Sequence, residues 1–382
     1  MITRRSVLLG AGGGLAVAVG GGALFATTRT PHAALAPWEA PGTLAEDPRV
    51  KALEWAILVP NPHNRQPWNV ELVGRDEVVL TCDLDRRLPM TDPYDRQITI
   101  GLGCFVEMFA LAAASEGLST KITPFPEGEP GETARLDQRP VAHLLLHDGG
   151  TPDPLFAHAP HRRTNKEPYE DRAIDAAHLE AVIAEGTRTS IGATTDPSMV
   201  ETLRQIAAEA WLIESATPRT HKESVDLMRF GKAEINANPD GIDLGGPMLE
   251  ALHLAGLLTP KTMVDPQSTA FAQGEAMYAD LFNTAKGWIW VTTEDNSRAA
   301  QLAAGRDWLR ANLAATGVGL AVQPMSQCLQ EYEEVAPLLA QTHDALGTDG
   351  TQRVQLLARA GYGPTVAPSP RWPAASRVVK RG

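Results

Sequence analysis

Two short polar segments of the chain have residue types that suit ligand binding. The first is PNPHNRQPW (60–68), in which two prolines and two asparagines fix a tight turn. Its side-chain amides and imidazole can donate and accept hydrogen bonds, which suits the edge of a heteroaromatic ring. A plain helix stop with asparagine turns would account for the same residues without any ligand. The segment is therefore a candidate ring-binding turn with a structural alternative.

The second segment is HRRTNK (161–166), which is rich in cations. Arg162, Arg163 and Lys166 supply positive charge, and Thr164 adds a hydroxyl. Guanidinium groups present planar sets of donors, which match the oxygen atoms of a phosphate group. An exposed basic stretch without a ligand is the alternative for such a segment. The pattern predicts a phosphate site if other elements bring a ligand to it.

The elements around these segments alternate between helices and strands. Apolar spacing and capping signals predict helices that start at Asp47-Pro48, around Ile100–Leu111, at 175–185, at 197–217 and at 302–313. We expect strands at 69–74, 77–84, 141–146, 287–292, 319–323 and 353–360. This order predicts a layered α+β fold, with α/β as the alternative reading of the same elements. Residues 231–271 are rich in Gly, Pro and Met with weak periodicity, so we expect an irregular lid-like insertion.

Composition excludes several classes of protein. The chain has 382 residues and a formal net charge of −12, whereas a nucleic-acid binder needs a basic face. Cys82, Cys104 and Cys328 are too few and too scattered for a disulfide framework or a zinc site. His158 and His161 lack nearby carboxylate or cysteine partners, so we expect no metal site. The sequence offers no recognised arrangement for nucleophilic hydrolysis.

The amino-terminal segment differs in composition from the rest of the chain. Arg4 and Arg5 precede an uncharged, glycine-rich apolar stretch that runs to Ala26. Paired arginines before a mildly apolar segment are typical of a twin-arginine export signal, which we assign to residues 1–36. We therefore expect an exported protein of the periplasm or cell envelope that meets the membrane only through this segment. A retained N-terminal anchor is the alternative, because no clean cleavage site is visible.

Both polar segments resemble motifs of the nitroreductase family of flavoproteins. PNPHNRQPW is similar to that family's small-x-x-Asn-x-Gln-Pro-Trp turn, and RRTNK to its Arg-Arg-Ser phosphate motif. Residues 361–364 and 368–371 resemble the family's closing strand and its last phosphate-binding arginine. Residues 317–324 resemble the segment whose backbone passes under the isoalloxazine ring. The resemblance extends from about residue 44 to 377, apart from the lid-like insertion.

This resemblance implies that FMN is the cofactor and that flavin N5 carries the chemistry, so that no protein residue is required as the catalytic acid or base. The phosphate would be held by the cationic cluster with Arg371, and the ring edge by the turn. The cofactor-binding residues that it implies are Asn61, His63, Asn64, Gln66, Arg162, Arg163, Thr164, Lys166, Gln323, Pro324, Met325, Ser326 and Arg371. We expect part of the insertion to cover the flavin, with apolar surface supplied by Met248, Leu249, Leu252, Leu254, Leu257, Leu258 and Met263.

The order of the two motifs departs from that of ordinary nitroreductases, in which the arginine motif comes first. The reversed order resembles the single-chain, twin-arginine-exported branch with its mycobacterial Acg relatives, which look like a nitroreductase homodimer fused into one polypeptide. That resemblance implies two halves, 44–150 and 160–377, each with a mainly antiparallel sheet flanked by helices. One copy of each motif predicts a single FMN site across the halves, in a protein that is a monomer.

Two functions remain open on these grounds. The first is an FMN-dependent oxidoreductase that passes electrons from a donor such as NAD(P)H to a small-molecule acceptor. The second is a flavin-sequestering protein whose closed lid prevents turnover, which export favours because NAD(P)H is a cytoplasmic donor. A structural relic that binds no flavin is a third, weaker reading.

Overall fold

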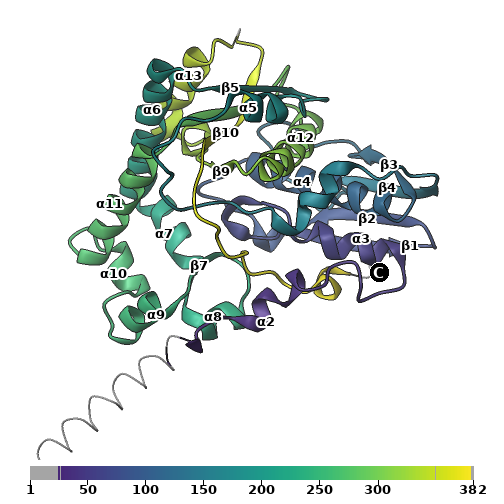
Figure 1. Ribbon diagram of the computed structural model, residues 1–382, viewed down its shortest axis with the longest axis horizontal. Coiled ribbons are helices and arrows are strands. Elements are labelled where there is room, and N and C mark those ends of the chain that lie inside the picture. Colours follow the sequence, from purple (N-terminus) through teal and green to yellow (C-terminus); the bar gives the residue numbers. More distant parts are fainter. Residues whose placement is uncertain (1–24, 26, 349, 380–382) are drawn as a thin grey trace, which may run out of the picture.

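The computed structural model describes residue 25 and residues 27–348 and 350–379 (Figure 1). Arg4 and Arg5 lie outside the described residues, as does most of the predicted signal segment. The described chain begins beside a short helix, α2 (His32–Leu35), which is followed by a 3-10 turn at Ala36–Trp38. These residues lead into the first of two α+β halves.

In the first half, one four-stranded antiparallel sheet has the strand order β1-β2-β4-β3. Its first helix begins where the Asp47 carboxylate accepts a hydrogen bond from the Arg49 backbone N–H, with Pro48 as the first helical residue. The elements of this half are α3 (Pro48–Ala56), β1 (Trp68–Val73), β2 (Glu77–Cys82), α4 (Arg96–Ser115), β3 (Leu118–Pro124) and β4 (Ala142–Asp148).

The second half repeats this arrangement. Its antiparallel sheet has the order β5-β8-β10-β9, which matches the first sheet strand for strand. Its elements are α5 (Ala176–Ile183), β5 (Ser190–Thr194), β8 (Gly287–Thr293), α12 (Arg298–Gly317), β9 (Ala321–Pro324), α13 (Ala336–Ala345) and β10 (Arg353–Gly361). The α+β prediction is therefore confirmed.

Helices α4 and α12 pack against each other between the two sheets (Figure 1). Glycine at the crossing allows their backbones to touch: a Cβ on Gly103 would lie 2.2 Å from the Leu302 carbonyl oxygen, and one on Gly305 1.9 Å from that of Ile100. Among the described residues, α4 is the one helix long and apolar enough to cross a membrane, but 83% of its apolar window is buried in this core.

The first arginine of each central helix reaches into the opposite half. Arg96 at the start of α4 donates to the carbonyl oxygens of Gln355 (2.6 Å) and Leu329 (2.7 Å). Arg298 at the start of α12 donates to those of Glu132 (3.1 Å) and Ala134 (2.5 Å). These reciprocal contacts join the halves through fully buried side chains.

A long insertion separates β5 from β8. It contains α6 (Pro197–Ala216), α7 (Pro218–Asp226), β6 (Met228–Phe230), α8 (Gly231–Ala237), β7 (Ile242–Leu244), α9 (Pro247–Leu254), α10 (Pro260–Val264) and α11 (Thr269–Asn283). The expectation of an irregular passage at 231–271 is wrong, because the short helices α8, α9 and α10 fill much of it. Of the apolar residues expected to cover a ring, three are exposed, at 72% for Met248, 70% for Leu254 and 62% for Leu257. The others, Leu249, Leu252, Leu258 and Met263, are half-buried.

The chain returns to the first half after β10. In Figure 1 the yellow C-terminal segment descends from β10 and ends beside β1 and α3. Val378 forms a parallel bridge with Val70 at the edge of β1, and the Val379 N–H donates to the Val70 carbonyl oxygen (2.8 Å). Residues 362–379 therefore carry Arg371 from the second half into the first.

Candidate functional site

The site is built around the C-terminal end of α3. Ile57, Leu58 and Val59 follow the helix, and their carbonyl oxygens point out of its last turn. Arg371 donates from Nε to Ile57 O (2.8 Å) and from Nη2 to Leu58 O (3.1 Å) and Val59 O (2.9 Å). Arg162 donates to the same Leu58 oxygen (3.0 Å). A helix C-terminus attracts cations, which explains why both guanidinium groups gather here.

These cations have no full counter-charge among the described residues. No ion pair joins Arg162, Arg163 or Arg371 to a carboxylate, although Asp243 lies near enough to influence Arg371. Burial, together with the neighbouring arginines, lowers the pKa of Arg162 to about 10 and that of Arg371 to about 9. Burying a positive charge away from water without a nearby anion costs free energy, so an anion that binds to this cluster would be stabilised there.

Two donors of the cluster are left unused. Arg162 Nη1 and Arg163 Nε are buried without a hydrogen-bond partner. Arg163 stacks over the ring of Trp38, with 4.5 Å between its guanidinium carbon and the ring centroid. Buried polar atoms are normally satisfied, so unused donors beside unpaired cations fit a missing anionic group such as a phosphate.

The predicted turn has a strained backbone. His63, Asn64 and Gln66 have φ values of 47°, 50° and 53°, in the left-handed region that non-glycine residues rarely adopt. Asn61 stabilises this shape, because its Oδ1 accepts a hydrogen bond from the Gln66 N–H (2.7 Å). Strain of this kind persists where surrounding contacts enforce it, and it is concentrated at functional sites.

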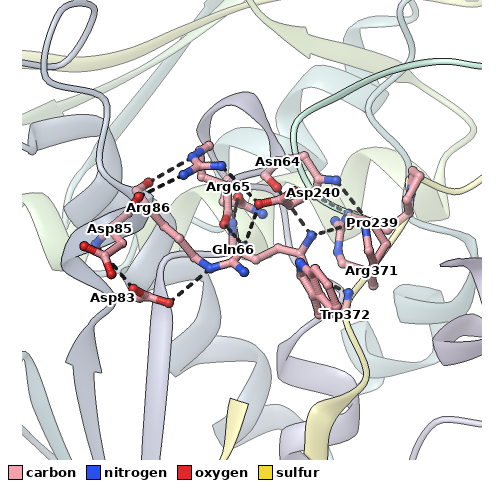
Figure 2. Close-up of polar contacts among 12 residues, drawn as sticks. Asn64, Arg65, Gln66, Asp83, Asp85, Arg86, Pro239, Asp240, Arg371 and Trp372 are labelled. Carbon is pink, nitrogen blue, oxygen red and sulfur yellow. Dashed lines mark hydrogen bonds and ion pairs between the residues drawn. The ribbon is translucent and has the colours of Figure 1, made fainter. Parts of the chain in front are cut away.

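The C-terminal segment supplies several of those contacts. Arg371 Nη1 donates to Asn64 Oδ1 (2.5 Å), and Asn64 Nδ2 donates to the Pro370 carbonyl oxygen (3.0 Å). The Trp372 N–H donates to Gln66 Oε1 (2.9 Å). Figure 2 shows Arg371 and Trp372 lying against the turn. The structure thus brings the turn and the cationic cluster together through Arg371.

The insertion holds the turn from another side. Asp240 accepts from Arg65 (3.0 Å) and Arg86 (2.7 Å) through Oδ2, and from Arg229 (3.2 Å) through Oδ1. Gln66 Nε2 donates to the Pro239 carbonyl oxygen at 2.7 Å (Figure 2). We call residues 239–241 with these arginines the Asp240 clamp. The clamp fixes the insertion on the turn.

The other predicted site residues differ in how they are placed. Lys166 is exposed and near enough to His63 to lower its pKa, and Thr164 is half-buried beside the arginines. Burial is the main cause of the low His63 pKa, about 4, so this imidazole is neutral at physiological pH. The N–H of Asn165 donates to the Val322 carbonyl oxygen (3.1 Å), so the cationic segment runs beside β9.

The predicted segment 323–326 is tied to β10. Gln323 Oε1 accepts from Arg359 Nε (2.8 Å), and Pro324 is paired in register with Ala358. The Met325 side chain is fully buried in the core of the second half, and the Ser326 hydroxyl bonds to Leu357. The Met325 side chain is therefore turned into the core, and the backbone is the part of this residue that could contact a cofactor, as the resemblance implies for this segment.

Sequence reasoning did not identify Trp38, Asp240 or Ser224 as parts of the site. Trp38 lies in a Pro/Ala-rich stretch that reads as a linker, yet its Nε1 donates to the Ser369 carbonyl oxygen (2.9 Å). Asp240 and Ser224 belong to the insertion and contact the turn across long sequence separations. No local pattern marks such contacts.

The equivalent region of the second half has a different charge balance. There, the loop after α5 carries Arg188, which pairs with the fully buried Asp307 at 2.7 Å. Arg310 pairs with Glu185 (2.9 Å) and Asp153 (2.8 Å). These cations are neutralised by the chain itself, in contrast to those at the end of α3.

Two cavities lie away from the candidate site. One of about 510 Å³ is lined by residues 151–155, His158, Glu185 and Arg310. The other, of about 430 Å³, lies between α13 and the loop before β10. Neither is lined by the turn or by the cationic cluster.

Comparison with known proteins finds related sequences, although no family model matches the chain. Proteins of Mycobacterium tuberculosis strains CDC 1551 and H37Rv are each 26% identical to it over 332 residues, covering 84% of this chain and 87% of theirs. Each carries the description "Putative NAD(P)H nitroreductase".

Solved structures also align with part of the chain. A nitroreductase with bound FMN from Desulfitobacterium hafniense covers 60% of this chain at 11% identity and a TM-score of 0.35, and 99% of its own length is matched. The FMN-dependent nitroreductase NfnB from Mycobacterium smegmatis, in complex with NADPH, covers 58% at 15% identity and a TM-score of 0.32, with 90% of its own length matched.

Proposed function

We propose that this protein binds one FMN between the turn and the cationic cluster and acts as an FMN-dependent oxidoreductase of nitroreductase type. The observation that carries the proposal is the group of arginines at the end of α3 without a carboxylate partner, of which Arg162 and Arg371 are buried. Arg162 and Arg163 each have an unused donor. A phosphate would supply the missing charge. The resemblance of the turn and the cationic segment to flavoprotein motifs supports a flavin as the bearer of that phosphate, and the description of the mycobacterial proteins supports a nitroreductase.

Each residue then has a role set by its contacts. Arg162 and Arg163 would hold the phosphate with their unused donors, and Thr164 and Lys166 would add to the same cluster. Asn64 would act by orienting Arg371, because its amide is already used there. Asn61 and Gln66 would keep the turn in its strained shape. When bound, FMN supplies hydride transfer at N5.

The direct test is the absorbance spectrum of the purified protein. We expect a yellow protein that is bleached by NADPH or dithionite and reoxidised by a nitroaromatic acceptor. A colourless protein that takes up no added FMN would contradict the proposal.

A flavin-sequestering function is the second candidate, and the Asp240 clamp favours it. The clamp fixes the insertion against the turn, which would slow exchange of a bound flavin and limit access of donors. A yellow protein that is bleached by dithionite but not by NADPH would support sequestration over turnover.

We further propose that the chain is a fused pseudo-dimer with one surviving site and that it is a monomer. The identical strand orders of the two sheets and the reciprocal Arg96 and Arg298 contacts support this origin. At the equivalent position of the second half, Arg188 and Arg310 are both neutralised by ion pairs with carboxylates. Light scattering of the purified protein should give the mass of one chain.

Export by the twin-arginine route also remains a proposal. It rests on Arg4 and Arg5 and on the apolar stretch that follows them. This route carries folded proteins, so it would deliver a chain already loaded with a cytoplasmic flavin.

A further inference from the structure

Helix α9 of the insertion turns its polar side chains toward the protein. Glu250 is 8% exposed, and its carboxylate accepts from Arg29 Nη1 (2.9 Å) and from the backbone N–H of Lys232 (3.1 Å). The half-buried His253 ring stacks on Phe230, with 4.9 Å between the ring centroids. A helix on a protein surface normally buries its apolar face and exposes its polar one, so α9 is oriented in the reverse sense.

The outer side of α9 continues into α10 as one apolar stretch. The exposed residues between positions 247 and 264 are Pro247, Met248, Ala251, Leu254, Ala255, Gly256, Leu257, Pro260, Lys261 and Val264. We call these residues the α9–α10 face. Lys261 is the single charged residue among them. Soluble proteins rarely expose a contiguous apolar surface of this kind unless it meets a partner or a membrane.

The start of the described chain is bound beside this face. Lys232 Nζ donates to the Thr28 carbonyl oxygen (3.0 Å), and Arg29 forms its ion pair with Glu250 on the inner side of α9. In Figure 1, α2 lies beside α8, while α9 and α10 lie at the lower left, apart from both sheets. Arg29 is therefore fixed next to the α9–α10 face.

The sequence before Arg29 is of the kind that enters a membrane. Residues 6–26 contain no charged side chain, and they form the apolar stretch of the predicted signal or anchor. Three residue steps separate Ala26 from Arg29, and an extended chain of that length spans at most about 11 Å. A bilayer that holds the apolar stretch would therefore lie within reach of the α9–α10 face.

We propose that the α9–α10 face docks on the lipid bilayer that the N-terminal apolar stretch enters. Its apolar side chains enter the boundary between the headgroups and the acyl chains, as those of helices lying in the plane of a membrane do. Burial of apolar surface drives this docking rather than attraction to anionic lipids, because the chain has a net charge of −12 and the face carries one lysine. Membrane contact was expected only through residues 1–36, so the face adds a second contact from the insertion.

The test places a fluorescent label on the face of the full chain in phosphatidylcholine vesicles. Cys82, Cys104 and Cys328 are buried, so the cysteine of Leu254→Cys is the one that takes the label. Part of the lipid carries a nitroxide on its acyl chain, which quenches a label that enters the bilayer. Ile183→Cys is the matched control, because Ile183 is an exposed apolar residue of α5, at the opposite end of Figure 1 from α9. We expect quenching several-fold stronger at position 254 than at position 183, and equal quenching would overturn the proposal.

A second variant separates docking from simple tethering by the N-terminal stretch. Leu257→Glu in the labelled Leu254→Cys chain leaves the tether intact but removes an apolar side chain from the face. Loss of one buried leucine should lower the ratio of docked to undocked protein roughly tenfold or more. Ile183→Glu in the same labelled chain adds the same charge away from the face and should leave the quenching unchanged. Undiminished quenching in Leu257→Glu would overturn the proposal, because the tether alone would then explain it.

The same label identifies a second copy of the chain as the alternative occupant. A label at position 254 that is shielded from water but not quenched by the nitroxide lipid, with a mass of two chains in light scattering, would overturn membrane docking. Circular dichroism of each variant checks that the fold is intact, which we expect because Leu254 and Leu257 are 70% and 62% exposed. None of these measurements depends on bound flavin, so their outcome is separate from that of the proposed function.

Discussion

The Asp240 clamp gives a prediction that can be worked out from the contacts. Asp240 is 8% exposed and is the shared partner of Arg65, Arg86 and Arg229. Asp240→Asn keeps the shape of the side chain but removes the only charge these arginines have in common. Removing one partner of a buried ion pair typically costs about 3–5 kcal/mol, because the remaining charge stays buried. We expect a loss near the lower end, since Arg86 keeps its pair with Asp83.

The assay is the free energy of unfolding in urea, together with limited proteolysis of the insertion. Asp226→Asn is the matched control, because Asp226 pairs with Lys222 at the surface, with side chains 57% and 66% exposed. Exposed pairs of this kind contribute less than about 1 kcal/mol. We expect Asp240→Asn to be cut faster within 195–286 and to be destabilised by about 3 kcal/mol, and Asp226→Asn to resemble the wild type. Equal stability of the two variants would refute the clamp.

The remaining predictions concern the buried carboxyl group, the helix crossing and export. Burial raises the pKa of Glu214 to about 7, so the folded protein favours the protonated carboxyl group. The resulting contribution to the free energy of unfolding is complete below about pH 4.5 and is lost as the pH rises through about 7. Glu214→Gln cannot ionise, so urea unfolding should find it more stable than the wild type at pH 8, by up to about 3 kcal/mol, and similar at pH 5; the opposite pH trend would show that the carboxyl group is paired. Gly305→Ala places a Cβ 1.9 Å from the Ile100 oxygen and should cost about 3 kcal/mol or more in urea unfolding, whereas Gly274→Ala on α11, where nothing lies within 4 Å, should be neutral or stabilising. Equal effects of these two glycine variants would mean that α4 and α12 do not cross closely. Changing Arg4 and Arg5 to Lys should leave the protein in the cytoplasm, as fractionation would reveal, and normal yield outside the cytoplasm would contradict twin-arginine export.

Much of the fold could be predicted because its signals are local. Asp47-Pro48 and Asp196-Pro197 both start helices through a carboxylate cap, and both helices begin where the sequence indicates. The predicted strands at 353–360 and 287–292 fall within one residue of β10 and β8. β9 begins at Ala321 rather than at Gly319, because Gly319 has φ of 72° and forms a turn.

Other elements could not be predicted because tertiary contacts decide them. β5 contains Gly192, which weakens a strand pattern, but a Cβ there would lie 2.3 Å from the Trp290 ring. Glycine is required here by the close approach of the Trp290 ring on the neighbouring strand, although it weakens the strand pattern of β5 itself. Helices α8, α9 and α10 of the insertion are short, and they lie in a Gly- and Pro-rich sequence that reads as a loop.

The candidate site shows the same division. The turn and the cationic segment could be found from the sequence because each is a compact motif. Their common anchor, the end of α3 with Arg371, depends on a partner more than 300 residues away, as the separation of 307 between Asn64 and Arg371 illustrates. Trp38 and Asp240 join the site only through such long-range contacts.

The stoichiometry and location of bound FMN test the central proposal most directly. Titration of the flavin-free protein should give one FMN per chain. Arg163→Ala should weaken that single site about ten- to a hundredfold, because a lost charge-assisted contact costs roughly 1.5–3 kcal/mol. Asn64→Ala should weaken the same site indirectly, because it removes the contact that orients Arg371. Two FMN per chain, or one FMN whose affinity neither substitution changes, would contradict a single site built across the two halves.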